Sequence, residues 1–268
     1  MSDVTNTDPL LDDRAPIRRK WWLEVAYVLA FYVVYSTIRN QFGSGGSFSV
    51  GSARALDNAL NVIEAEDTIG LYVEQGIQEA FIEWEWFIRF WNIFYGSLHF
   101  IVTGGAMIWL YLKTPNRYRR YRNILSATTA LALLGFSFFP LMPPRLLNAG
   151  GEYGANLADH HYVDTLADIG GLWSFDSGTM QAISNQWAAM PSLHIGWALW
   201  CTLALFPVLS MRWQRWAIAA YPVLTLFAIV VTGNHYWIDA AGGALTLLLG
   251  WHIGNRASRW IKPRQPVI

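Results

Sequence analysis

Charge and cysteine are both scarce in this chain. Only 14% of the residues are Asp, Glu, Lys or Arg, whereas an ordinary soluble domain carries about 25%. The one cysteine, Cys201, excludes an intramolecular disulfide and a cysteine zinc cluster. Low-complexity tracts and internal repeats are also lacking. The composition therefore argues against an ordinary soluble domain and against a fold held together by disulfides or cysteine-bound zinc.

The chain is instead rich in hydrophobic residues, which make up 53% of it and form long apolar stretches. At about 1.5 Å rise per residue, six stretches are long enough to cross about 30 Å of hydrocarbon as helices. These predicted spans are residues 21–38, 86–112, 123–142, 191–209, 216–232 and 237–254. The sequence therefore predicts an all-α polytopic membrane protein built as a six-transmembrane-helix bundle.

Positive charge is distributed unevenly along this topology. Fifteen of the 19 Lys and Arg residues fall on one side, and only Arg39, Arg54, Arg89 and Arg145 fall on the other. By the positive-inside rule both termini are cytoplasmic. The expected organisation is a cytoplasmic tail at 1–20, a membrane catalytic domain at 21–255 and a second cytoplasmic tail at 256–268. We expect an integral protein of a bacterial plasma membrane, and no nucleic-acid partner, because the cations lie in short loops.

Two long connections, residues 40–85 and 143–190, are then extracytoplasmic. The first has apolar and acidic residues at nearly helical spacing, which predicts interfacial amphipathic helices that lie on the membrane or cap the bundle. Residues 43–47 within it are rich in glycine and serine and predict a flexible connection. The second is rich in proline and glycine and too long for an idle link, which favours an active-site loop over a mobile surface segment.

Two short motifs place a histidine where a predicted span begins, His194 in one and His235 in the other. Asp239 follows His235 by four residues, so a helix would put both on one face. The carboxylate could hold one ring nitrogen of His235 and leave the other free to attack phosphorus. His194 could protonate the departing oxygen. This combination indicates phosphoryl transfer.

Arg145 leaves the third predicted span on the same membrane face, and its guanidinium suits bidentate phosphate contact. Pro191 is expected in the first turn of the fourth span. Asn234 is expected to cap the sixth span, after Gly233 ends the fifth. Both of these spans would then present the positive ends of their helix dipoles to an anion. We therefore expect Arg145, His194 and the His235–Asp239 pair to share one pocket at the outer leaflet.

Each of these residues also has a structural interpretation. A histidine at a membrane border often makes an interfacial hydrogen bond, and a lone arginine there can anchor at lipid headgroups. Tyr95 and His99 share a face of the second span, where substrate contact and a structural hydrogen bond fit equally well. His160, His161 and Asp164 could bind a metal, but solvated histidines fit a glycine-rich loop better. No metal and no cofactor are expected.

At these residues the chain resembles the type 2 phosphatidic acid phosphatase superfamily. It is most similar to the branch of inositol phosphorylceramide synthases and inositolphosphotransferase-like proteins. The family's second and third motifs correspond to 191–194 and 235–239, and 143–145 resembles the branch's reduced first motif. The likeness extends over residues 54–255. Further positions that fit the branch are Glu66, Glu74, Asn92, Tyr95 and His99.

The resemblance implies a metal-independent phosphohistidine mechanism on a membrane lipid phosphate or phospholipid. It implies that His235 is the nucleophile, that Asp239 orients it and that His194 is the acid. Phosphate binding would fall to Arg145 and Ser192. Candidates for substrate contact are Asn92, Tyr95, His99, Asn234 and Tyr236.

The chain departs from the broader superfamily at two cationic positions. Ile229 stands where an arginine precedes the nucleophile by six residues, and Phe138 stands where a lysine precedes the first-motif arginine. The phosphate clamp must therefore be built with fewer fixed cations. This difference weakens any transfer of substrate preference from the ordinary phosphatases.

Three functions stay open on the sequence alone. The first is a phosphotransferase with an alcohol acceptor such as inositol or another polyol, or a lipid. The second is a phosphatase that uses water to hydrolyse phosphatidate or a polyprenyl phosphate. The third, from a different class, is a non-enzymatic lipid transporter or scaffold, but polar groups clustered at one end of the spans favour an enzyme.

Overall fold

The computed structural model describes residues 21–42, 48–150, 153–171 and 185–260. Regular structure in these ranges is helical, and the only strand-like contact among them is an isolated bridge between Leu141 and Ala188. The predicted tail at 1–20 and the predicted connection at 43–47 lie outside the described residues. The all-α prediction is confirmed.

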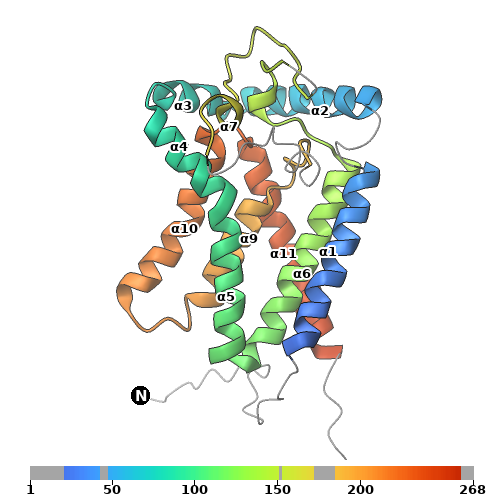
Figure 1. Cartoon of the computed structure of the whole chain (residues 1–268), viewed down its shortest axis with the longest axis vertical. Coiled ribbons are helices and arrows are strands. Elements are labelled where there is room, and N and C mark those ends of the chain that lie inside the picture. The colour runs from blue at the N-terminus through green and yellow to red at the C-terminus, as the bar shows by residue number, and fades with distance from the viewer. Residues whose placement is uncertain (1–20, 43–47, 151–152, 172–184, 261–268) are drawn as a thin grey trace, which may run out of the picture.

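The long helices run side by side as a bundle (Figure 1). Each corresponds to one predicted span, although the bounds differ. They are α1 (Trp21–Phe42), α5 (His99–Lys113), α6 (Pro115–Phe138), α9 (Leu193–Leu205), α10 (Arg212–Val231) and α11 (Trp237–Trp260). Before α5, α4 (Glu85–Ile93) continues through the π-helical turn η1 (Phe94–Leu98), so that residues 85–113 form one long helical segment.

The ends of two helices correct the sequence-based bounds. Helix α6 covers Pro115–Phe138, whereas the predicted span was 123–142. The apolar pattern missed the beginning of the helix because its first two turns are basic, and Pro115 suits the first helical position. Its end at Phe138 reflects Pro140, which has no amide to continue the helical hydrogen bonds. Helix α9 begins at Leu193, so Pro191 precedes the helix and does not occupy its first turn.

Two helical segments of the described chain are long and apolar enough to cross a membrane, Glu85–Lys113 and Arg212–Val231. Shorter apolar helices cover Trp21–Val34 and Leu193–Leu205. The prediction of six spans goes beyond these two segments and stays a prediction.

Helices α2 (Phe48–Thr68) and α3 (Glu74–Phe81) lie across one end of the bundle (Figure 1). Backbone and side-chain hydrogen bonds attach α2 to the segment after α6: Met142 N–H donates to Ala55 O at 3.1 Å, and Asn58 donates to Pro140 O at 2.7 Å. An apolar cluster also joins Ala55, Ala59 and Val62 to this segment. Helices α2 and α3 therefore form a helical cap on the bundle.

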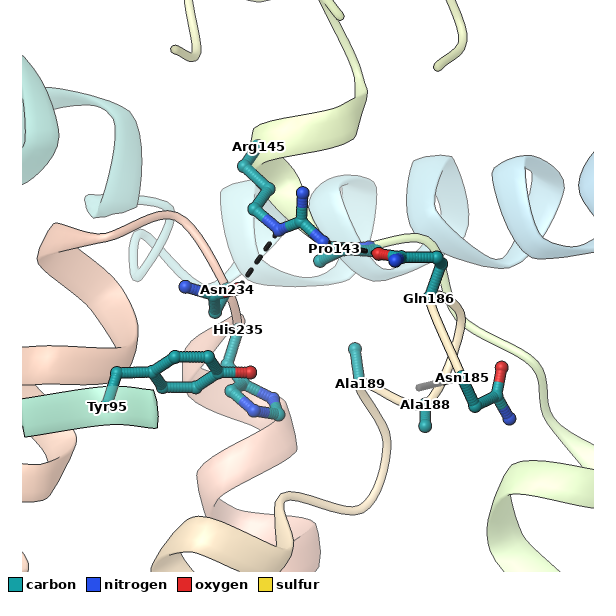
Figure 2. A pocket seen from close by; sticks show the side chains of 9 residues that line it. All are labelled: Tyr95, Pro143, Arg145, Asn185, Gln186, Ala188, Ala189, Asn234 and His235. Carbon is teal, nitrogen blue, oxygen red and sulfur yellow. Dashed lines mark hydrogen bonds between the residues drawn. The ribbon is translucent and has the colours of Figure 1, made fainter. Parts of the chain in front are cut away.

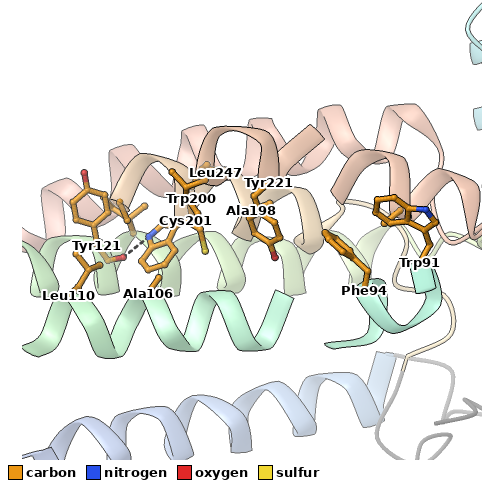
Figure 3. Packing of buried hydrophobic residues seen from close by; sticks show 14 of the residues in the cluster. Trp91, Phe94, Ala106, Leu110, Tyr121, Ala198, Trp200, Cys201, Tyr221 and Leu247 are labelled. Atoms are coloured by element: carbon orange, nitrogen blue, oxygen red, sulfur yellow. Dashed lines mark hydrogen bonds between the residues drawn. The ribbon is translucent and has the colours of Figure 1, made fainter. Parts of the chain in front are cut away.

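The main apolar core lies between the bundle helices (Figure 3). Within it, Trp200 of α9 donates from its indole N–H to Tyr121 O of α6 at 2.9 Å. Glycines let α11 approach its neighbours closely. A Cβ on Gly254 would lie 2.6 Å from the backbone of Ile124 in α6, and one on Gly243 would overlap the carbonyl of Ser192. This close packing draws the beginnings of α9 and α11 together.

Candidate active site

His235 lies in the tight turn between α10 and α11. Gly233 adopts a left-handed conformation with φ of 66°, which is favourable for glycine, and ends α10 as predicted. Asp239 follows in the first turn of α11. Its Oδ2 atom lies 3.2 Å from His235 Nδ1 and also accepts the Tyr236 N–H at 3.0 Å. Because a carboxylate oxygen accepts, Nδ1 of His235 is the donor and Nε2 is left without the proton.

His194 lies in the first turn of α9, beside His235. Their ring centroids are 5.5 Å apart. The imidazole of His194 stacks on the Tyr95 ring at 4.3 Å and meets the His99 ring at 4.2 Å. Its Nε2 atom is buried and has no hydrogen-bond partner among the described residues. A backbone bond from Ser192 N–H to Asp239 O, 2.9 Å long, ties this turn to α11.

Arg145 enters the same region from the short helix η2 (Pro144–Leu146). Its backbone N–H donates to Gly233 O at 2.8 Å, which fixes η2 against the turn that carries His235. The guanidinium donates to Asn234 Oδ1 at 3.0 Å, to Asp164 Oδ2 at 2.6 Å and to Gln186 Oε1 at 2.6 Å. The arginine is 5% exposed, so its charge is balanced mainly by Asp164.

A polar cavity of about 40 Å³ lies between these elements (Figure 2). A single water needs about 10–15 Å³ of such space, so the cavity has room for a group the size of a phosphate. Arg145 is the one cation among its described lining residues. The lining consists of Tyr95, Pro143, Arg145, Asn185, Gln186, Ala188, Ala189, Asn234 and His235.

Four residues predicted to contact substrate or phosphate lie behind this lining. Asn92 fastens α4 to the outer loop by donating to Thr165 O at 2.8 Å and to Gly170 O at 2.9 Å. His99 bonds through Nδ1 to Tyr95 O in its own helix at 2.9 Å. Ser192 is fully buried, with no partner for its hydroxyl among the described residues. Tyr236 donates to Met142 O at 3.1 Å, and burial raises the pKa of its phenol well above the ordinary value, so the phenol remains a donor.

Asn234 does line the cavity, but it does not cap α11 as predicted. Its carboxamide accepts from Arg145 and donates to Thr232 Oγ1 at 2.8 Å. The first amides of α11 end on carboxyl groups instead: Trp237 N–H donates to Glu74 Oε1 and Ile238 N–H to Glu66 Oε1, both at 2.8 Å. Burial raises the pKa of Glu66 to about 8, and the neighbouring carboxyl group of Glu74 adds to this increase.

The two positions that lack the cations expected from the resemblance carry apolar side chains in different settings. Phe138 is 72% exposed at the end of α6, and Ile229 is fully buried beside Ile195 and Val230. Amide side chains take part of the space around Arg145, namely Asn185, Gln186 and Asn234. Sequence reasoning missed Gln186 and Asn185, because amides in a long loop have no periodic or motif signal.

The loop histidines do not form a metal centre with Asp164. Asp164 pairs with Arg145 and accepts the amides of Leu166 and Ala167 at the start of α7 (Thr165–Asp168). His161 is exposed, and His160 lies 3.5 Å from the hydroxyl of Tyr72. Among the residues with described positions, no group of three His, Cys, Asp or Glu side chains could hold a metal ion.

Comparison with models of known protein families gives a match. Searches of curated proteins and of solved structures returned none. The family model described as PAP2 superfamily matches residues 60–253, well over half of the chain, including every cavity-lining residue. This match confirms the superfamily that the sequence motifs indicate. The chain belongs to the PAP2 superfamily, whose members are phosphatases and phosphotransferases that act on phosphate esters.

Proposed function

We propose that the protein is an integral membrane lipid-phosphate phosphotransferase that works through a phosphohistidine on His235. The observation that carries the proposal is the geometry of His235 itself. Its Nδ1 atom is held by Asp239, and the side chain lines a phosphate-sized cavity together with Arg145 (Figure 2). An imidazole oriented in this way by a carboxylate is an activated nucleophile.

In the first step, Nε2 of His235 attacks phosphorus and the bond from phosphorus to the lipid oxygen breaks. A bound phosphate anion holds His194 in its protonated form, and this histidine, whose ring is 5.5 Å from that of His235, gives its proton to the departing oxygen. In the second step, the acceptor hydroxyl attacks the phosphohistidine while His194 takes its proton. The phosphorus–nitrogen bond breaks, and both histidines return to their starting states. Arg145 stabilises the charge on the phosphoryl oxygens.

A polar cavity wall is compatible with a polyol acceptor. The wall carries the amide side chains of Asn185, Gln186 and Asn234, which hold Arg145 and the loop in place. The resemblance to the inositolphosphotransferase branch points the same way. Water is the alternative acceptor and would make the protein a phosphatase for phosphatidate or a polyprenyl phosphate.

The outer surface of the bundle is largely apolar, which supports a membrane location with six spans. Large apolar side chains stand exposed along α5, α10 and α11, and soluble proteins rarely leave such continuous apolar area in water. Examples are Phe100, Ile101, Ile108, Val223, Leu245 and Leu248. With the basic loops cytoplasmic, the cavity and the α2–α3 cap face the outside of a bacterial plasma membrane.

The test uses purified protein and lipids that carry labelled phosphate, with and without a polyol. A labelled phospho-alcohol that appears only with the polyol supports transfer, and free phosphate alone supports the phosphatase. The His235→Ala variant should lose at least about 10³-fold in rate, because catalysis without its nucleophile is residual. His252→Ala is the matched control, since His252 is exposed on α11, the helix that follows His235. Full activity of His235→Ala would refute the mechanism and favour a transporter or scaffold.

A further inference from the structure

Two fully buried glutamates of the cap meet the beginning of the helix that carries Asp239. Glu66 belongs to α2 and Glu74 to α3, and both are 0% exposed. Their Oε1 atoms accept the N–H groups of Ile238 and Trp237, each at 2.8 Å. With the Tyr236 N–H on Asp239, three consecutive amides end on three carboxyl groups. These amides belong to the three residues that separate His235 from Asp239.

The bonds matter because the first amides of a helix have no acceptor within the helix. A buried amide without a partner is costly, and the positive end of the helix dipole favours carboxyl oxygens. The Asn234 side chain does not accept these amides, since it is hydrogen-bonded to Arg145 and Thr232. The two glutamates therefore determine the path of residues 236–238.

The two glutamates differ in the bonds they make. Glu66 accepts from Ile238 through Oε1, while its Oε2 atom has no hydrogen-bond partner among the described residues, so it needs one acceptor. Glu74 accepts from Trp237 through Oε1 and from Val73 N–H through Oε2 at 2.9 Å. A glutamine has one oxygen and one NH₂ group, so it can replace Glu66 but not Glu74.

We propose that Glu66 and Glu74 are positioning residues, which hold the backbone between His235 and Asp239 so that the carboxylate stays on Nδ1 of the nucleophile. The cap thus takes part in the reaction geometry although it touches no reacting atom. The inference rests on the proposed role of His235.

The proposal is tested with Glu66→Gln, Glu66→Ala, Glu74→Gln and Glu74→Ala in the full-length protein, with Glu64→Gln and Glu79→Gln as controls. Both control glutamates are exposed on the same two helices. We expect Glu74→Gln and both alanine variants to lower kcat by about 10- to 100-fold, the loss typical of a small misplacement of a reacting group. KM should stay within about twofold. Glu66→Gln and both controls should keep the wild-type kcat within about twofold.

A second readout does not depend on turnover. In protein labelled with ¹⁵N-histidine, the ring signals of His235, assigned by their loss in His235→Gln, report which nitrogen carries the proton. We expect a proton on Nδ1 in the wild type and in Glu66→Gln, and a mixture of tautomers in Glu74→Gln. If no lipid phosphate is turned over, the proposed function fails while this measurement still decides the inference.

The pH dependence gives a third readout with a definite sign. Because the pKa of folded Glu66 is raised from 4.5 to about 8, the folded protein binds a proton that the unfolded chain has lost. Its free energy of unfolding therefore falls as the pH rises from about 4.5 to about 8. The charged groups that face Glu66 are Glu74 from α3 and Asp239 from α11. Glu66→Gln should reduce this dependence of the free energy of unfolding on pH.

Two results would overturn the proposal. The first is a wild-type kcat together with unchanged tautomers in Glu74→Gln. The second is an equal loss of kcat in Glu66→Gln and Glu66→Ala.

Discussion

At the scale of single residues, the most informative group is the guanidinium of Arg145. The sequence shows that this arginine is one of four cations predicted on the outer side of the membrane. It cannot show that Asp164, nineteen residues later in an irregular loop, binds the same guanidinium. In the proposed phosphate-binding role of Arg145, an incoming phosphate would compete with the Asp164 carboxylate for the guanidinium. Its binding free energy is the difference between two ion pairs, which predicts moderate affinity for the substrate.

Asp164→Asn tests this competition. Asparagine keeps an oxygen for the amides of α7 but removes the charge that faces Arg145. Inorganic phosphate should then bind about 3- to 10-fold more tightly, because a partly buried pair of this kind contributes on the order of 1 kcal/mol. The inhibition constant of phosphate against lipid turnover measures the effect. Asp168→Asn, exposed on the same short helix, should leave it unchanged. Weaker phosphate inhibition in Asp164→Asn would contradict the competition.

At the scale of elements, apolar runs predicted where the helices are but not how they end. The early start of α6 was missed because arginines occupy its first turns, and a hydropathy window excludes them. The cap of α11 was missed for a different reason. Asn234 has the right residue type and position, but the carboxyl groups that do the capping come from residues more than 160 positions away. Only a long-range contact could reveal them.

The contact between α6 and α11 gives a prediction at this scale. In Gly254→Ala the new Cβ would meet the Ile124 backbone, so the helices must move apart. We expect the free energy of unfolding to fall by about 1–3 kcal/mol. Gly104→Ala is the matched control, since nothing lies within 4 Å of a Cβ there and alanine favours a helix by about 0.5–1 kcal/mol. Thermal unfolding in one detergent compares them, and equal midpoints for the two variants would contradict the close packing.

At the scale of the whole molecule, the segments that carry the sequence motifs lie together, although they are far apart along the chain. Residues 143–145, 191–194 and 233–239 meet at one end of the bundle, although 45 residues separate the first two segments and 38 separate the last two. The family match confirms the superfamily. What the sequence could not predict is how the loop and the cap close the site, because amides and carboxylates pair there without any periodic pattern.

The proposed topology can be tested with introduced cysteines. The native Cys201 is fully buried, so the wild type should not react with a membrane-impermeant maleimide. We expect Glu79→Cys, exposed on the cap, to be labelled in intact cells. Arg212→Cys, exposed at the opposite end, should be labelled only after permeabilisation. Labelling of both variants from the same side would contradict six spans with the cap outside.

Helix α1 contributes no residue to the described lining of the cavity. It packs along α6 through the Glu24–Arg122 ion pair, exposes apolar side chains along most of its length and precedes the residues matched by the family. For the proposed membrane enzyme, substitutions on the outer surface of α1 should therefore change how much protein accumulates in the membrane, while the turnover of each folded molecule stays the same. For engineering, this makes α1 the place to attach a reporter or exchange a tether without disturbing the chemistry.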